Sequence, residues 1–260
     1  MKGALYLVPT PLDFGCDAPL PPVTDVLPQA TLLHMARLNH WVCENARTLR
    51  ALLKRVDAVQ PLAQALQNLD IQEIPRAWHK KGDHQAAPDM ALARALLAPA
   101  LQGHDMALAS EAGMPAVADP GSSLVRAAHA LGIAVVPLVG PSSILLAVAA
   151  SGLNGQNFAF CGYLPQDATA RANRLRELER LAATTGQSQW WIETPYRNQA
   201  VLQQAVQVLR PATLLCLASG LTLPQARIMT RPVQAWRAQN PADCVDKLPT
   251  VFGLGAAPKG

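Results

Sequence analysis

Residues 110–121 read SEAGMPAVADPG and follow a short apolar run, Met106 to Ala109. Gly113 and Gly121 let a ligand approach the backbone closely because glycine has no Cβ, and the prolines of the stretch stiffen the loop. In an open parallel sheet, ligands bind at the loops that follow the carboxyl ends of strands. Taken alone, however, a turn of this kind is more often a plain connector between a strand and a helix.

Two further turns rich in glycine and proline also follow apolar runs. One covers Pro9 to Gly15 and the other covers Gly140 to Ser143. Three such turns favour a ligand site over three unrelated connectors. The chain has neither a GxGxxG pattern nor a P-loop, which argues against a dinucleotide site or a P-loop phosphate site. A site built from backbone amides and carbonyls suits a cofactor that contains adenosine.

Short apolar runs alternate with helical stretches along the 260 residues, and this order predicts an α/β fold with a mostly parallel sheet. The length fits two compact domains. We place the joint at Gly140-Pro141, which gives N-terminal and C-terminal α/β domains of residues 1–139 and 140–260. The expected strands are residues 5–8, 39–44, 106–109, 133–139, 158–162, 189–192, 213–218 and 228–232, the last at a sheet edge. The expected helices are residues 32–37, 46–56, 89–101, 122–131, 144–150, 168–184 and 199–209.

Residues at the ends of these elements give further expectations. Asp89 is expected to cap the helix that follows it, and Ser122 or Ser123 the helix after the loop 110–121. Residues 70–88 are expected to be irregular. The tail from Thr250 is rich in glycine and proline and is expected to fray.

The composition limits the classes of function. Charged residues make up 15% of the chain, and the net charge of +4 permits an RNA partner without requiring one. The five cysteines form no CxxC pair, which indicates a reducing compartment. The apolar runs are too short for a signal peptide or a membrane span, and the histidines lack metal-ligand spacing. We therefore expect a cytoplasmic protein with no metal site and no membrane partner.

Two conspicuous features favour a structural interpretation. Trp190 and Trp191 are adjacent, so in a strand they point to opposite faces, and core packing is favoured over stacking on a base. The expected helix at residues 168–184 carries arginines interspersed with Glu177 and Glu179, which favours a solvated face over an RNA contact.

Five short motifs occur along the chain in a defined order. They are YLVPTP at residues 6–11, SEAGMPAVADPG at 110–121, GPSS at 140–143, FAFCGYLP at 158–165 and ETPYR at 193–197. This set resembles the tetrapyrrole methylase superfamily of methyltransferases that use S-adenosylmethionine (SAM). Within it, the set is most similar to the 16S ribosomal RNA ribose 2′-O-methyltransferase branch, whose pattern reads SDAGTPxISDPG, PGPSA, FxGFLP and YESPxR. The resemblance spans nearly the whole chain.

The resemblance implies a fold, a cofactor and an assembly. The fold would be a two-domain α/β fold of the tetrapyrrole methylase type, with a mostly parallel sheet in the N-terminal domain and a mixed sheet in the C-terminal domain. SAM would lie in the cleft between the domains, and the protein would be a homodimeric methyltransferase. The positions that match the SAM-binding motifs are Pro9, Gly113, Pro115, Val117, Ser142, Ser143, Leu164, Thr194 and Pro195.

Methyl transfer to a hydroxyl group benefits from a base that accepts the proton. Glu44 and Glu111 adjoin the proposed cleft loops and are the candidate catalytic bases. Arg47 is a candidate for holding a phosphate of an RNA substrate, and Tyr196 and Arg197 are candidates for contacting the substrate. The alternatives are that Glu44 simply pairs with Arg47 at the start of a helix and that Arg197 is a surface charge.

Several positions depart from the pattern of the family on the side where the substrate approaches. The family's AEDTR reads CENAR here, with Asn45 and Ala46 in place of Asp and Thr. Its TPIGN reads TPLDF, and Glu111 and Met114 replace the Asp and Thr of SDAGTP. These changes leave the SAM interpretation intact, but they do not decide which molecule accepts the methyl group. Ribosomal RNA is the leading acceptor, and the alternatives are a small molecule such as a tetrapyrrole or a module that binds SAM without catalysis.

Overall fold

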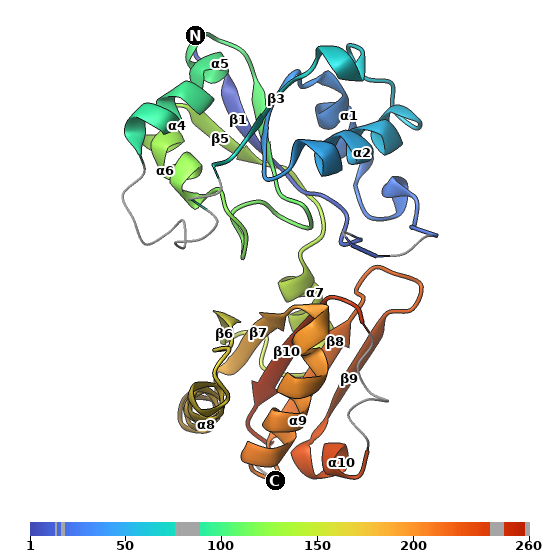
Figure 1. Cartoon of the computed structure of the whole chain (residues 1–260), viewed down its shortest axis with the longest axis vertical. Coiled ribbons are helices and arrows are strands. Elements are labelled where there is room, and N and C mark those ends of the chain that lie inside the picture. Colours follow the sequence, from blue (N-terminus) through green and yellow to red (C-terminus); the bar gives the residue numbers. More distant parts are fainter. Residues whose placement is uncertain (14, 17–18, 76–77, 79–88, 240–246, 258–260) are drawn as a thin grey trace. The chain divides into compact units, whose positions relative to one another are not determined.

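The computed structural model describes residues 1–13, 15–16, 19–75, 78, 89–239 and 247–257. The chain divides into two compact units, Met1–Ser142 and Ser143–Gly260 (Figure 1). Gly140-Pro141, where we placed the joint, lies in the loop just before this boundary.

The sheet of the first unit is entirely parallel. Its strand order is β3-β2-β4-β1-β5, and every neighbouring pair runs in the same direction. The mostly parallel sheet predicted for the N-terminal part of the chain is thereby confirmed. The strands are β1 (Ala4–Val8), β2 (His40–Cys43), β3 (Asp70–Glu73), β4 (Met106–Ala109) and β5 (Ala134–Pro137).

Both faces of this sheet are covered. In β4, Ala107 and Ala109 belong to one buried cluster, whereas Met106 and Leu108 belong to another. This is the two-residue period of a strand buried on both sides, and it explains why β4 contains no polar residue.

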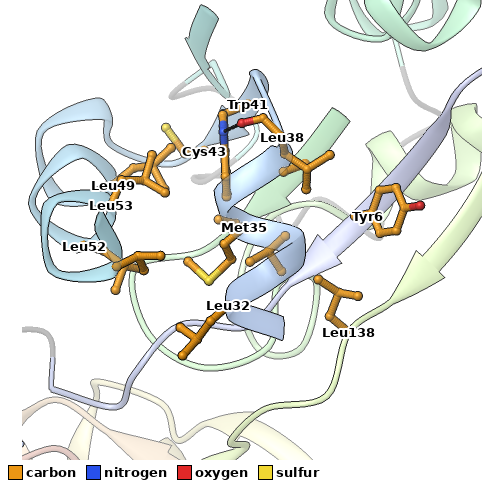
Figure 2. Packing of buried hydrophobic residues seen from close by; sticks show 14 of the residues in the cluster. Tyr6, Leu32, Met35, Leu38, Trp41, Cys43, Leu49, Leu52, Leu53 and Leu138 are labelled. Carbon is orange, nitrogen blue, oxygen red and sulfur yellow. Dashed lines mark hydrogen bonds between the residues drawn. The ribbon is translucent and has the colours of Figure 1, made fainter. Parts of the chain in front are cut away.

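Helices α1 and α2 pack on the first face, and α4, α5 and α6 contribute to the cluster on the second. Figure 2 shows Met35 of α1 together with Leu49, Leu52 and Leu53 of α2 in the first cluster. The helices are α1 (Gln29–Arg37), α2 (Ala46–Asp57), α4 (Met90–Leu96), α5 (Ala98–Leu101) and α6 (Ser122–Ala130), with short 3-10 helices at Val23–Asp25 and Leu66–Asn68.

The sheet of the second unit is mixed, as predicted. Its order is β6-β7-β10-β8-β9, and only the β6–β7 pair is parallel. The strands are β6 (Phe158–Tyr163), β7 (Ser188–Glu193), β8 (Leu214–Ser219), β9 (Arg227–Pro232) and β10 (Thr250–Gly255). The helices are α7 (Ser143–Ser151), α8 (Ala168–Thr185), α9 (Asn198–Val208) and α10 (Val233–Arg237), with a 3-10 helix at Pro195–Arg197.

The adjacent tryptophans of β7 fill the core on opposite faces of this sheet. Trp191 stacks on Phe252, with ring centroids 5.6 Å apart, in the cluster that includes residues of α8, α9 and α10. The indole N–H of Trp190 donates to Ser188 Oγ at 2.8 Å. Neither tryptophan is exposed, so the prediction of core packing is confirmed.

Two stretches expected to be irregular form strands. The tail predicted to fray from Thr250 is β10, which is buried along its length and pairs with β7 on one side and β8 on the other. Within residues 70–88, Asp70–Glu73 forms the edge strand β3, while residues 76, 77 and 79–88 lie outside the described part of the chain. Both predictions were based on composition, which does not reveal hydrogen bonds to distant strands.

The helix boundaries were predicted less well than the helices themselves. Asp89 caps α4 as expected, because its carboxylate accepts from the N–H groups of Ala91 and Leu92, both at 3.1 Å. The single helix expected over residues 89–101 is interrupted at Leu97. At α6 the cap position is occupied by Gly121, with no capping side chain, so the prediction that Ser122 or Ser123 caps this helix is wrong.

Candidate functional site

The loops that follow β1, β2 and β4 meet at one edge of the parallel sheet. Val8 and Cys43 both lie beside Ala109 in the register of the sheet, so the three strands end at the same level. Beyond them, Thr10 and Gly113 exchange two backbone hydrogen bonds of 2.9 and 3.0 Å. Strand pairing thus brings three distant stretches of sequence together.

The third Gly-Pro turn joins this loop cluster. A Cβ on Gly140 would lie 2.3 Å from Cγ of Pro9, so only glycine permits the contact. A Cβ on Gly113 would lie 3.6 Å from the carbonyl oxygen of Pro141. The three turns that we interpreted as parts of one ligand site are therefore neighbours in the first unit.

The loop of residues 110–121 has a strained backbone. Ala116 and Ala118 have φ values of 64° and 66°, in the left-handed region that residues with a Cβ rarely adopt. Gly121 has a φ of 134°, and a Cβ there would lie 2.9 Å from Cδ2 of Leu108. Strain of this kind is concentrated at ligand and active sites, where the surrounding structure maintains it.

Three carboxylates, those of Glu44, Glu111 and Asp119, interact at this loop. Glu44 Oε1 accepts from the backbone N–H of Glu111 at 3.2 Å, and Glu111 Oε1 accepts from Thr48 Oγ1 at 3.2 Å. Burial, and next the carboxylate of Glu44, raise the pKa of Asp119 to about 7, although a hydrogen bond with Ser110 opposes this shift. A carboxyl group with a pKa near neutrality is suited to proton transfer.

Asp119 is the residue that the sequence reasoning missed. The structure brings the predicted bases Glu44 and Glu111 together, and Asp119 lies beside them. The signal was present, because Asp119 is the second acidic residue of the loop 110–121. Its distinguishing property is burial, however, and burial cannot be read from the motif.

Helix α2 begins beside the carboxylates, and Asn45 caps it. The side chain of Asn45 accepts from the N–H groups of Arg47 and Thr48 at 2.9 and 3.4 Å, and the N–H of Ala46 donates to Glu73 Oε1 at 2.7 Å. Asn and Asp are about equally good N-caps. Asn45 therefore retains the start of the helix despite its departure from the AEDTR pattern.

Replacing Asn45 with Ala is expected to lower the free energy of unfolding by about 0.5–2 kcal/mol, because two N–H groups of α2 lose their acceptor. Asn45→Asp should have a much smaller effect, since a carboxylate accepts the same hydrogen bonds. Urea unfolding of the three proteins measures the difference. Equal stability of the Ala variant and the natural chain would mean that the cap is not important.

A cavity of about 210 Å³ lies between the loop after β1, helix α2 and Ser110-Glu111. Leu49 and Leu52 of α2 provide part of its apolar wall. Asp13, which is buried, forms an ion pair with Arg55 of α2 at 2.8 Å, and both residues line the cavity. This ion pair ties the loop after β1 to α2.

The expected SAM-binding residues of the first unit differ in exposure. Pro9, Gly113 and Pro115 are buried, Ser142 is half-buried and Val117 is 43% exposed. The buried residues fix the positions of the loops, so any contribution they make to binding comes through backbone atoms and shape.

The expected residues of the second unit lie on α7 and after β6 and β7. Ser143 is half-buried at the start of α7, and Leu164 is buried. Thr194 Oγ1 is buried and makes no hydrogen bond to another described residue. Pro195 and Tyr196 are exposed, Tyr196 to 80%.

Arg197 makes internal contacts. Its Nε lies 3.2 Å from Glu193 Oε2, and its Nη2 donates to the carbonyl oxygens of Leu164 and Pro165 at 3.0 and 3.1 Å. Burial raises the pKa of Glu193, and the guanidinium of Arg197 acts in the opposite direction. With a side chain only 15% exposed, Arg197 joins the loops after β6 and β7 and is not a surface charge.

The family model for the tetrapyrrole (corrin/porphyrin) methylases matches residues 43–235, which is well over half of the chain. The chain belongs to the tetrapyrrole methylase family. The match starts at the end of β2 and includes the loop 110–121 and most of the second unit.

Relatives of this methylase carry a more specific name. It is 34% identical over 235 residues to a protein of Mesorhizobium japonicum named "Ribosomal RNA small subunit methyltransferase I", in a match that covers 90% of the chain and 69% of the relative. A protein of Xylella fastidiosa with the same name is 34% identical over 178 residues, which cover 68% of the chain and 54% of the relative. The match thus spans little more than half the length of that second relative.

Solved structures of other methyltransferases share the fold of this methylase. The methyltransferase CobJ has a TM-score of 0.56 at 17% identity, covering all of this chain and 98% of the other. Uroporphyrin-III C-methyltransferase from Thermus thermophilus has a TM-score of 0.52 at 16% identity, covering 98% and 94%. The fold predicted from the motifs is confirmed.

The described residues contain neither a metal-binding cluster nor a membrane-spanning helix. No group of three or more His, Cys, Asp or Glu side chains among them is placed to hold a metal ion. In the same part of the chain, every helix is too short or too polar to cross a membrane.

Proposed function

We propose that this methylase transfers a methyl group from SAM to a ribose 2′-hydroxyl of ribosomal RNA. The observation that carries the proposal is the 34% identity, over 90% of the chain, to a relative named as a ribosomal RNA methyltransferase. The solved methyltransferase structures are only 17% and 16% identical, so they support the fold without favouring a tetrapyrrole acceptor. A module that binds SAM without catalysis is also not favoured, because the relatives are named as methyltransferases.

The residues present fit SAM in charge. SAM carries a sulfonium, an ammonium and a carboxylate, so it is a cation overall, and the three carboxyl groups beside the loop 110–121 are acidic groups that suit its positive centres. The buried hydroxyl of Thr194 is a polar group available to a ligand of the second unit. When bound, SAM supplies a methyl group activated by the sulfonium sulfur. The proposed SAM-binding residues are Pro9, Gly113, Pro115, Val117 and Ser142 in the first unit and Ser143, Leu164, Thr194 and Pro195 in the second.

In this proposal Asp119 would accept the proton of the ribose hydroxyl. The hydroxyl oxygen would gain the methyl group as the bond between that methyl carbon and the sulfur of SAM breaks, and S-adenosylhomocysteine would leave. The pKa of Asp119, about 7, suits that proton transfer near neutral pH. Glu44 and Glu111 keep this pKa raised by their negative charge, and their hydrogen bonds hold the loop in place. The remaining rate enhancement comes from holding the acceptor in line with the methyl group.

Titration calorimetry and radiolabelling test the two halves of the proposal. The natural chain is expected to bind SAM, and absence of heat would refute the cofactor. With tritiated SAM, we expect label in small-subunit ribosomal RNA taken from a strain that lacks the enzyme. Label in a tetrapyrrole fraction, with none in RNA, would refute the proposed acceptor.

We further propose a cytoplasmic homodimer, since ribosomal RNA is the proposed substrate and the family resemblance implies a dimer. Helix α7 supports an apolar contact, because it has no charged residue and its Leu145 and Leu146 are 57% and 38% exposed. Sedimentation should give about twice the 27.7 kDa of one chain. A species of 27.7 kDa at micromolar concentration would contradict the dimer.

A further inference from the structure

One face of α2 carries three exposed cations, Arg47, Arg50 and Lys54, which we call the α2 basic face. Their spacing of i, i+3 and i+7 places the three residues within about 60° of one another around the helix axis. Along the axis, Arg47 and Lys54 are separated by about 10 Å. The opposite face of α2 carries Leu49 and Leu53, which are buried in the core (Figure 2).

The α2 basic face is unfavourable for the helix itself. Arg47 and Arg50 are three residues apart and Arg50 and Lys54 four, and like charges at these spacings repel by about 0.2–0.5 kcal/mol per pair. Arg47 also lies in the first turn, where the helix dipole disfavours a cation and where α2 has no acidic residue, whereas Lys54 lies in the last turn, where the dipole favours one. A gain outside the helix is therefore expected to offset this repulsion.

Several other basic side chains near the α2 basic face and on α8 contact groups within the protein. Arg55 of α2 is ion-paired with Asp13, and Arg174 of α8 is ion-paired with Glu177 at 2.7 Å. Arg171 of α8 donates to the carbonyl oxygen of Gln166 at 2.8 Å. Within the described part of the chain, the ion pairs that we find leave the α2 basic face available to a partner.

We propose that the α2 basic face binds the phosphodiester backbone of the RNA substrate, an inference that rests on the proposed function. Three exposed cations in a row complement a polyanion, and lysine and arginine contacts to phosphates supply most of the affinity of such complexes. The face starts one residue before Thr48, whose hydroxyl donates to Glu111. An RNA strand held there passes close to the proposed acid–base residues, so the same contact positions the acceptor ribose.

The test is the salt dependence of RNA binding. The variant Arg47→Gln/Arg50→Gln/Lys54→Gln should bind a small-subunit ribosomal RNA fragment at least about 10-fold more weakly at low salt than the natural chain does. The slope of log affinity against log salt should fall by about 2, since each phosphate contact to a single strand contributes about 0.7. Its affinity for SAM should be unchanged. The matched control, Arg174→Gln/Arg176→Gln/Arg180→Gln on α8, removes the same charge and should keep the natural slope.

The outcomes separate this inference from the proposed function. If the natural chain methylates RNA and the α2 variant keeps its salt slope, the α2 basic face is not the RNA surface although the proposed function stands. An equal loss in the α8 control would indicate an effect of net charge and would also refute the inference. If the natural chain binds SAM but no RNA at any salt concentration, both proposals fail. Circular dichroism verifies folding, and the single variants Arg50→Gln and Lys54→Gln should each lower the slope by about 0.7.

Discussion

Asp119→Asn is expected to lower the rate of methyl transfer by about 10²- to 10⁴-fold, the usual contribution of a general base. Asparagine has nearly the same shape as aspartate but cannot accept the proton. It also removes a half-buried negative charge near Glu44 and Glu111, so the variant should fold. Single-turnover transfer from tritiated SAM to RNA, at saturating SAM, measures the rate of the chemical step.

The pH profile gives Asp119 a signature that a structural role would not give. The natural chain should become more active as pH rises through about 7, where Asp119 loses its proton, and Asp119→Asn should lose this inflection. The folded-state pKa lies above the ordinary value, so the folded state binds the extra proton between about pH 4 and pH 7. The contribution of Asp119 to stability therefore falls as pH rises through this window, and Asp119→Asn should flatten that dependence.

The matched control for Asp119→Asn is Asp25→Asn, which changes an exposed aspartate in the 3-10 helix Val23–Asp25. It should retain the rate and the pH profile of the natural chain. Full activity of Asp119→Asn would remove Asp119 from the mechanism. The predicted bases Glu44 and Glu111 would then be tested by the corresponding glutamine variants.

Gly253→Ala should have the largest effect on stability, lowering the free energy of unfolding by about 1–3 kcal/mol or more. Gly253 lies in the central strand β10, opposite Trp190 on one side and Cys216 on the other. A Cβ there would lie 2.5 Å from the ring of Trp190, which is fully buried and cannot move without disturbing the core. Urea unfolding followed by tryptophan fluorescence reports the change.

Gly155→Ala is the control for Gly253→Ala, because its Cβ would meet only Val148 Cγ1 at 3.5 Å, an ordinary contact. Combining Gly253→Ala with Trp190→Leu should cost less than the sum of the two single changes, since the smaller side chain removes the clash. Two results would contradict this account: strictly additive losses of unfolding free energy, or a Gly253→Ala variant as stable as the natural chain. Either would show that the Trp190 ring does not exclude a Cβ at position 253.

The sequence predicted the strands that a continuous apolar run marks. The apolar runs that became β1, β4 and β8 are buried on both faces and stand out against polar flanks. Strand β3 was missed because Asp70 to Glu73 is a polar edge strand, held by pairing with β2. Strand β10 was missed because two glycines and a nearby proline resemble a frayed end, although Trp190 occupies the space that Gly253 leaves.

The loops of the candidate site were predictable, because their backbone conformation depends on glycine and proline. Glycines and prolines in short turns identified the three loops that contact one another in the first unit. The state of an individual side chain was not predictable, because it depends on burial. Asp119 acquires its raised pKa from burial and from Glu44, which is distant in sequence. The ion pair of Arg197 joins the first and last residues of ETPYR, but the motif does not reveal that its side chain is largely buried.

The position of β10 has a consequence for the order in which the protein matures during synthesis. The strands of the first sheet are all present in the nascent chain once Pro137 has left the ribosome. The second sheet cannot close until Gly255 has left it, because β10 lies between β7 and β8. The first unit can therefore fold while the ribosome is still translating, as N-terminal domains generally do. Until Gly255 has left the ribosome, β7 and β8 each lack the neighbour that β10 provides and leave the backbone groups on that side unpaired, which is the kind of strand edge that promotes aggregation.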